Sequence, residues 1–175
     1  MILRAWVSLS LCVCALSAAA GPDDFHAGNV IPDYGKVATV TAAASLPSTT
    51  QFSVAFDVGE AAEEGQVNRR MASAARLINM HEEAGIDPDN TRVAIVVHGS
   101  AALDLVNDER FGGPNPNAGL IAALTKAGVR IILCGQTAAY RDVAAADLLD
   151  GVSMSLSAMT AHALLQQQGY TLNPF

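Results

Sequence analysis

The sequence predicts an α/β protein, a three-layer α/β/α sandwich around a mostly parallel sheet of four or five strands. Residues 93–97 and 129–133 are short apolar runs rich in β-branched side chains, which is typical of strands buried on both faces. Segments with the spacing of helices alternate with these runs. Since the connections are short, each helix must cross the sheet to begin the next parallel strand.

Residues 1–20 predict a cleavable secretory signal peptide. A basic start containing Arg4 precedes the apolar run 5–16, and residues 18–20 form an Ala-x-Ala site after which we expect cleavage. The alternative is an uncleaved membrane anchor, but the apolar run is shorter than the roughly 20 residues that a spanning helix needs. The expected location is therefore the periplasm, with no membrane partner.

Removal of residues 1–20 from the 175-residue chain leaves 155 residues, enough for one domain with a substantial core. This remainder carries 9 Lys and Arg against 17 Asp and Glu, a net charge of −8 with neutral histidines. An acidic chain without a basic cluster argues against nucleic acid or an anionic membrane as a partner. Only Cys134 of the three cysteines remains, which excludes an internal disulfide.

Residues 21–50 predict an extended N-terminal arm, because they contain three prolines and show no sustained hydrophobic period. Phe25, Val30, Ile31 and Tyr34 are the side chains in it that could pack on the domain. The sequence leaves open whether the arm packs in this way or is a simple spacer.

The remaining residues, 51–175, predict a single domain of alternating strands and helices. Asn68 and Asn117 are expected to cap helices, and Met159, Ala163 and Leu164 to form the inner face of the last helix. The predicted elements are strand 51–58, a helix from 68 to about 85, a turn at 87–90, strand 93–97, a helical turn at 101–106, a polar loop at 107–116, helix 119–127, strand 129–133, helix 137–144, a helical turn at 144–149, strand 151–156 and helix 158–168.

The most informative stretch is the end of strand 129–133, where Cys134 and Gly135 lead into a helix that Thr137 can cap. Ligands bind at this edge of open parallel sheets, and nearby backbone N–H groups favour a thiolate over a thiol. The functional interpretation is a reactive cysteine. A buried, inert thiol is the other interpretation, and the spacing alone does not decide between them.

Further candidate residues lie at the same predicted edge. His98 ends strand 93–97, and if the two strands are neighbours its imidazole can lower the pKa of the Cys134 thiol or take its proton. Arg141, two helical turns beyond the cysteine, can supply positive charge to an anionic sulfur ligand or form a surface ion pair. The candidate ligand-binding residues are Gly99, Gly135, Gln136, Thr137 and Arg141.

Other kinds of site have little support. The four histidines are scattered and one cysteine remains, so no close-spaced metal-ligand pair is present. Neither a dinucleotide-binding fingerprint, nor a P-loop, nor the nucleophile turn of serine hydrolases follows a strand. We therefore expect no metal and no cofactor.

Four segments together resemble the DsrE/DsrF-like family of small sulfur-relay proteins, and within it an exported branch. They are residues 96–99 (Val-Val-His-Gly), 127–131, 134–141 (Cys-Gly-Gln-Thr-Ala-Ala-Tyr-Arg) and 168–170 (Gln-Gly-Tyr). The resemblance covers roughly residues 51–172 and implies a DsrE-like α/β domain in a flavodoxin-like arrangement. Asp142 departs from the pattern, because relatives often have glycine there.

The resemblance implies that Cys134 accepts sulfur as a persulfide, and that the chain assembles as a trimer or hexamer. A sulfur donor or acceptor protein, or a small thiol, would be its partner. We keep two alternatives: a non-catalytic small-ligand-binding or assembly domain with a structural cysteine, and a redox sensor that forms intermolecular disulfides through Cys134. Whether the protein is an enzyme, a sulfurtransferase, stays open.

Overall fold

The computed structural model describes residues 21–41 and 43–173. The predicted signal peptide, residues 1–20, lies outside the described residues. None of the helices in the described ranges has the length and apolar character to cross a membrane.

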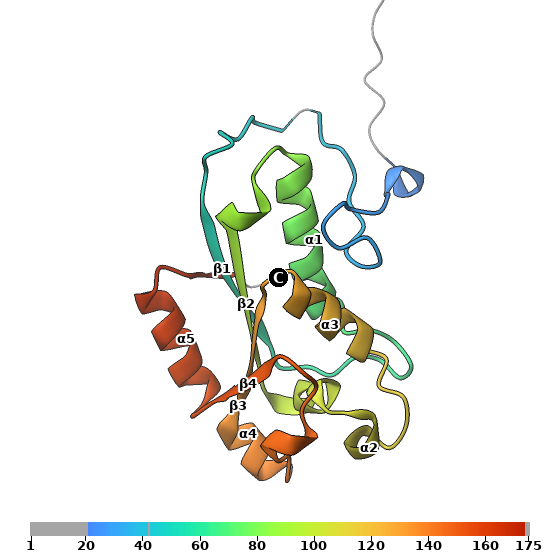
Figure 1. Cartoon of the computed structure of the whole chain (residues 1–175), viewed down its shortest axis with the longest axis vertical. Coiled ribbons are helices and arrows are strands. Elements are labelled where there is room, and N and C mark those ends of the chain that lie inside the picture. Colours follow the sequence, from blue (N-terminus) through green and yellow to red (C-terminus); the bar gives the residue numbers. More distant parts are fainter. Residues whose placement is uncertain (1–20, 42, 174–175) are drawn as a thin grey trace, which may run out of the picture.

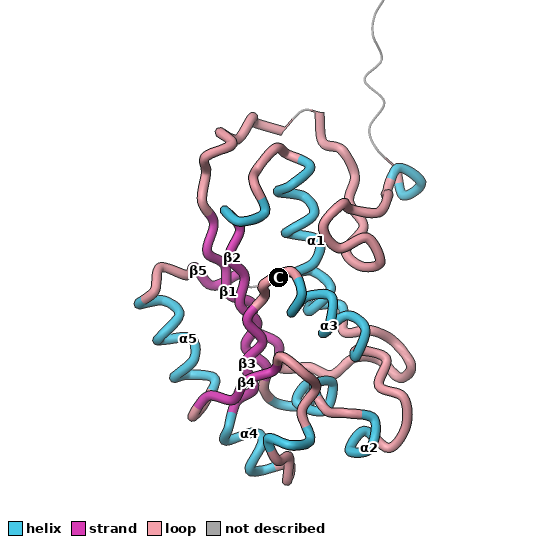
Figure 2. The backbone as a smooth tube through the Cα atoms, viewed as in Figure 1, coloured by secondary structure: helices cyan, strands magenta, loops and turns pink. Residues whose placement is uncertain are grey.

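A five-stranded parallel sheet forms the centre of the molecule (Figure 2). Its strand order is β4-β3-β2-β1-β5, and each of the four pairings is parallel. This confirms the predicted α/β class, although the order differs from the 2-1-3-4-5 order of flavodoxin itself. The strands are β1 (Phe52–Val58), β2 (Thr91–Val97), β3 (Arg130–Cys134), β4 (Val152–Ser155) and β5 (Thr171–Asn173).

Helices cover both faces of the sheet, which gives the predicted three layers (Figure 1). Helices α1 and α3 lie on one face and α5 on the other, while α4 follows β3 at one edge. The helices are α1 (Arg69–Glu83), α2 (Asp108–Phe111), α3 (Ala118–Lys126), α4 (Gly135–Tyr140) and α5 (Ala158–Gln167), with the 3-10 helices η1 (Pro22–Asp24), η2 (Pro88–Asn90), η3 (Gly99–Leu105) and η4 (Ala145–Asp147).

The alternation of side chains along the strands divides the core in two. On β1, Val54, Phe56 and Val58 belong to the larger cluster beneath α1 and α3, whereas Ala55 belongs to the smaller cluster beneath α5. Ile132 on β3 faces α5 in the same way. Since successive side chains of a strand point to opposite faces, Cys134 also faces α5.

Several elements begin or end elsewhere than predicted. Helix α4 begins at Gly135, so Cys134 is its N-cap and Thr137 lies in its first turn instead of capping it. Asn117 precedes α3 but makes no capping hydrogen bond, because its side chain accepts one from the backbone N–H of Asn68. The polar loop at 107–116 contains one helical turn, α2.

The inner face of α5 differs from the prediction. Ala161 and Leu165 are buried on Ala55, Ala94 and their neighbours in the smaller core cluster, whereas Met159 is 80% exposed and Leu164 49% exposed. Five of the ten α5 residues are alanine, threonine or histidine, which mark the buried face of a helix only weakly, so the apolar spacing predicted the wrong face. Because the strands present small alanine side chains here, α5 packs on them through a face that includes the small Ala161.

The N-terminal arm packs against the domain through α1. Asn79, fully buried on α1, hydrogen-bonds four backbone groups of the arm: the N–H and C=O of Ile31 and the carbonyls of Tyr34 and Gly35. Ile31 is buried and Tyr34 is partly buried against the core, while Phe25 is exposed. Of the two interpretations left open for the arm, the structure supports packing.

Candidate functional site

Cys134 lies where β3 ends and α4 begins, at the carboxyl edge of the sheet. Cys134 is 6% exposed, and its register partner on β4 is Ser155. Gly135 is required directly after it, because a Cβ there would lie 2.6 Å from the carbonyl oxygen of Ser155. The turn between β3 and α4 therefore holds the thiol between the end of β3, the first turn of α4 and the start of α5.

The surroundings of the thiol favour its ionised form. Burial raises the pKa of the Cys134 thiol, but hydrogen bonds from the Thr137 hydroxyl and from the backbone N–H groups of Thr137, Ala158 and Gln136 outweigh burial and hold the pKa below its ordinary value. Two of these N–H groups belong to α4 and one, that of Ala158, is the first of α5. The geometry supplies hydrogen bonds that stabilise a sulfur anion.

Thr137 also joins the thiol to the predicted residues Gly99 and Arg141. The Gly99 N–H donates to Thr137 Oγ1 at 3.4 Å, and Arg141 Nε donates to the Gly99 carbonyl at 2.7 Å. Arg141 thus reaches the sulfur only through two other residues, whereas Thr137 contacts it directly. Gln136 contributes its backbone N–H to the thiol and uses its side chain to bond the Leu156 carbonyl at 3.3 Å.

His98 lies beside Cys134 but its ring is directed elsewhere. The preceding residues Val97 and Leu133 are register partners, so the two side chains follow neighbouring strands on the same face. However, His98 Nε2 hydrogen-bonds Asp57 Oδ2 at 3.1 Å, on the opposite neighbour β1, and no hydrogen bond between His98 and the thiol is present among the described residues. The predicted edge is shared, but the imidazole and the thiol are not hydrogen-bonded.

Asp57 and His162 complete a cluster that the sequence did not reveal. Asp57 Oδ1 accepts a hydrogen bond from His162 Nε2 at 2.7 Å, so one carboxylate lies between two imidazoles. Burial raises the pKa of Asp57, but the hydrogen bonds from His98 and His162 outweigh this and lower it. The sequence could have indicated Asp57, because the alternation of side chains along β1 places it on the face opposite Phe56. No sequence pattern indicated that Asp57 would contact His162.

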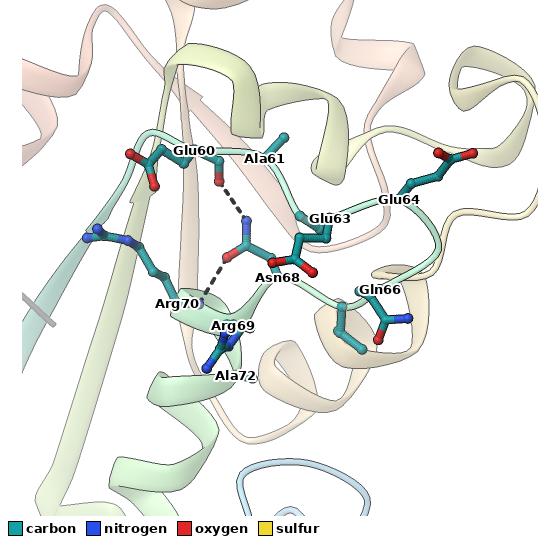
Figure 3. Close-up of a pocket in the computed structure, with 11 residues that line it drawn as sticks. Glu60, Ala61, Glu63, Glu64, Gln66, Asn68, Arg69, Arg70 and Ala72 are labelled. Carbon is teal, nitrogen blue, oxygen red and sulfur yellow. Dashed lines mark hydrogen bonds between the residues drawn. The ribbon is translucent and has the colours of Figure 1, made fainter.

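Two cavities border the loop between β1 and α1 at this same edge. The larger, of about 880 Å³, is lined by that loop and the first turn of α1, where Asn68 donates to the Glu60 carbonyl and accepts from the Arg70 N–H (Figure 3). The second, of about 490 Å³, lies between the same loop, η3 and the segment before α3. Neither is lined by Cys134.

Within residues 21–41 and 43–173, no group of three His, Cys, Asp or Glu side chains has an arrangement that could hold a metal ion. His26 of the arm bonds Glu83 at the end of α1, and His81 bonds Thr91 and lies against the Phe52 ring, so both lie outside the cluster at Asp57.

Two solved protein structures are similar to this chain in fold. A protein of unknown function, MTH1491 from Methanobacterium thermoautotrophicum, is 21% identical and superimposes with a TM-score of 0.52 over 71% of this chain and 100% of its own. The ychN protein from E. coli is 16% identical, with a TM-score of 0.53 over the same shares. At these identities the likeness concerns the fold. No curated protein matches the sequence.

The family comparison covers the whole sheet and the cysteine turn. The sequence model of the DsrE/DsrF-like family matches residues 52–174, from the first residue of β1 to beyond the last strand. This agrees with the resemblance of the cysteine turn and with the parallel fold. The chain is therefore a member of the DsrE/DsrF-like family.

Proposed function

We propose that this protein binds or relays sulfane sulfur as a persulfide on Cys134. Membership of the DsrE/DsrF-like family indicates a role related to sulfur relay. The observation that carries the proposal is the position of a thiol at the carboxyl edge of a parallel sheet, at the turn between β3 and α4, where hydrogen bonding by Thr137, Gln136 and Ala158 lowers its pKa.

The chemistry needs a thiolate and a donor of sulfane sulfur. The Cys134 thiolate attacks the outer sulfur of thiosulfate, the sulfur–sulfur bond of thiosulfate breaks, and sulfite leaves with the electron pair of that bond. The product is the persulfide anion of Cys134, so charge and sulfur balance without an external oxidant. An acceptor thiolate then attacks the outer sulfur and regenerates the Cys134 thiolate.

The hydrogen bonds at the turn have a defined part in this cycle. Thr137 and the N–H groups of Gln136 and Ala158 stabilise the thiolate that starts the reaction and returns at its end. Arg141 contributes indirectly: it donates to the carbonyl of Gly99, and the N–H of Gly99 in turn donates to Thr137. His98 is the candidate to take the thiol proton, although its Nε2 is hydrogen-bonded to Asp57 in this structure.

The small exposed fraction of Cys134, 6%, favours small sulfur donors or a partner thiol on a protruding segment. Export of the protein to the periplasm and assembly as a trimer or hexamer belong to the same proposal; they rest on residues 1–20 and on the family resemblance. The partner is a sulfur donor or acceptor protein or a small thiol. Light scattering of the purified protein tests the assembly.

Intact mass after incubation with thiosulfate or polysulfide tests the proposal. The expected result is a gain of one or more sulfur masses that reductant reverses and that Cys134→Ser abolishes. Thr125→Val is the matched control, because it removes a hydroxyl remote from the thiol and should load as the natural protein does. No adduct, with alkylation typical of an ordinary thiol, would instead support a binding or assembly domain with a structural cysteine.

A further inference from the structure

The 490 Å³ cavity is lined by both charged and apolar side chains. It opens between the loop that follows β1 and the segment between α2 and α3, at the edge of the sheet where ligands of parallel α/β folds bind. Its volume falls within the range of small-molecule sites. The apolar wall consists of Leu103, Phe111, Pro114 and Pro116, and Phe111 remains exposed there.

Asp104 places a buried carboxylate on this cavity. The residue is 4% exposed, and its Oδ2 accepts hydrogen bonds from the Ala62 N–H at 2.9 Å and from Asn68 Nδ2 at 2.7 Å. Burial raises its pKa and these two bonds offset part of that effect. No cationic side chain of the described residues forms an ion pair with it. A buried carboxylate without a cation is costly, so a cationic ligand group would stabilise it.

Arg141 lies on the same cavity and is likewise unpaired by charge. Its Nε donates to the Gly99 carbonyl, which fixes the guanidinium, while no carboxylate in residues 21–41 and 43–173 lies within ion-pair distance of it. Asp104 and Arg141 therefore contribute opposite charges to one cavity and form no ion pair with each other, and Glu63 and Glu64 of the loop between β1 and α1 also line it.

We propose that this cavity binds a small zwitterion with an apolar body, an amino acid or a dipeptide, whose ammonium group binds Asp104 and whose carboxylate binds Arg141. The apolar side chain of the ligand lies against Phe111 and the two prolines. Guanidinium binds carboxylate through two parallel N–H bonds, and a carboxylate accepts from an ammonium group, so the two side chains select the two charged groups of the ligand. The site does not include Cys134.

Calorimetric titration of the purified protein with four probes tests this site. L-Leucine and glycyl-L-leucine are zwitterions of the two sizes; N-acetyl-L-leucine lacks the ammonium group and L-leucinamide lacks the carboxylate. At least one zwitterion should bind, and each of the two leucine derivatives should bind at least about tenfold more weakly than leucine, or than the dipeptide if only that binds. Equal binding of all probes, or no binding of either zwitterion at millimolar concentration, overturns the proposal.

Two variants assign the ends of the ligand. Asp104→Asn keeps the shape and should weaken zwitterion binding, whereas Arg141→Gln should weaken the zwitterion and leave L-leucinamide unchanged. Asp150→Asn and Arg130→Gln lie outside the cavity and serve as matched controls. If Asp104→Asn does not fold, Arg141→Gln and the probe series still decide. Zwitterion binding should persist in Cys134→Ser. A failure of sulfur loading would therefore not count against this site.

Discussion

At the scale of single residues, Thr137 is the side chain that sets the state of the thiol. Its hydroxyl bonds the Cys134 sulfur and its Oγ1 accepts from the Gly99 N–H, so it links the sulfur to the end of β2. The sequence predicted Thr137 as a helix cap at this turn. Its actual position, in the first turn of a helix capped by Cys134 itself, follows from where the strand hydrogen bonds end, which residue types do not determine.

The first prediction concerns this hydroxyl. Thr137→Val removes the hydrogen bond and keeps the volume, so the pKa of Cys134 should rise and alkylation at neutral pH should slow several-fold. The measurement is the alkylation rate by iodoacetamide across a pH series. Thr125→Val should leave the profile unchanged. A Thr137→Val profile identical with that of the natural protein would show that the hydroxyl does not act on the thiol.

Asp142 is a second residue whose conformation matters. It has φ of 53°, in the left-handed region, and follows Arg141, the C-cap of α4. The Val143 N–H bonds the Ala138 carbonyl there, as in a helix end closed by glycine. The family resemblance implies glycine at this position. Asp142 thus occupies a conformation that an L side chain adopts at a cost.

Asp142→Gly should raise the free energy of unfolding by about 0.5–1 kcal/mol, because glycine adopts this φ without steric cost. Urea denaturation followed by circular dichroism measures it. Asp150→Gly is the control: residue 150 has no positive φ, so added backbone freedom should lower stability there. A loss of stability in Asp142→Gly would contradict the account of this helix end.

At the scale of elements, the strands were the most predictable part and the last helix the least. Continuous apolar runs determine β2 and β3, since buried parallel strands need them. The face of α5 is determined by Ala55 and Ala94 beneath it, which are far away in sequence. Residues Ala161 and Leu165 face the sheet in consequence, whereas the apolar spacing pointed to Met159 and Leu164.

Truncation of two adjacent leucines tests this orientation. Leu165 is 1% exposed and Leu164 is 49% exposed. Leu165→Ala should lower the free energy of unfolding by about 2–4 kcal/mol, as expected for a buried cavity, and Leu164→Ala by less than about 1 kcal/mol. Chemical denaturation of both variants gives the comparison. Equal losses, or the reverse order, would show that α5 is rotated.

At the scale of the whole molecule, the sheet brings together residues that no sequence pattern connects. The order of the strands places the ends of β1, β2 and β3 side by side, so Asp57, His98 and Cys134 lie along one edge. Parallel topology predicted that Cys134 and His98 would share this edge. It could not supply Asp57 and His162, because the crossing of α5 from β4 to β5 sets their contact.

The carboxylate between the two histidines predicts a dependence of stability on pH. The pKa of Asp57 is lower in the folded chain than its ordinary 3.8, so the group stabilises the fold above that value and the effect is lost as pH falls through the folded pKa. Asp57→Asn should therefore lower the urea midpoint near neutral pH, by an amount that shrinks below about pH 4. An offset that stays constant into acid would contradict this linkage.

The rate of sulfur loading as a function of pH tests the central claim most directly. The measurement follows the persulfide mass of the natural protein after mixing with thiosulfate, at pH values that span the alkylation midpoint of Cys134. We predict that the loading rate rises with the same midpoint as alkylation, since both need the thiolate, and that Cys134→Ser gains no sulfur. A loading rate that does not change with the fraction of Cys134 in the thiolate form, or loading that persists in Cys134→Ser, would contradict a persulfide on Cys134.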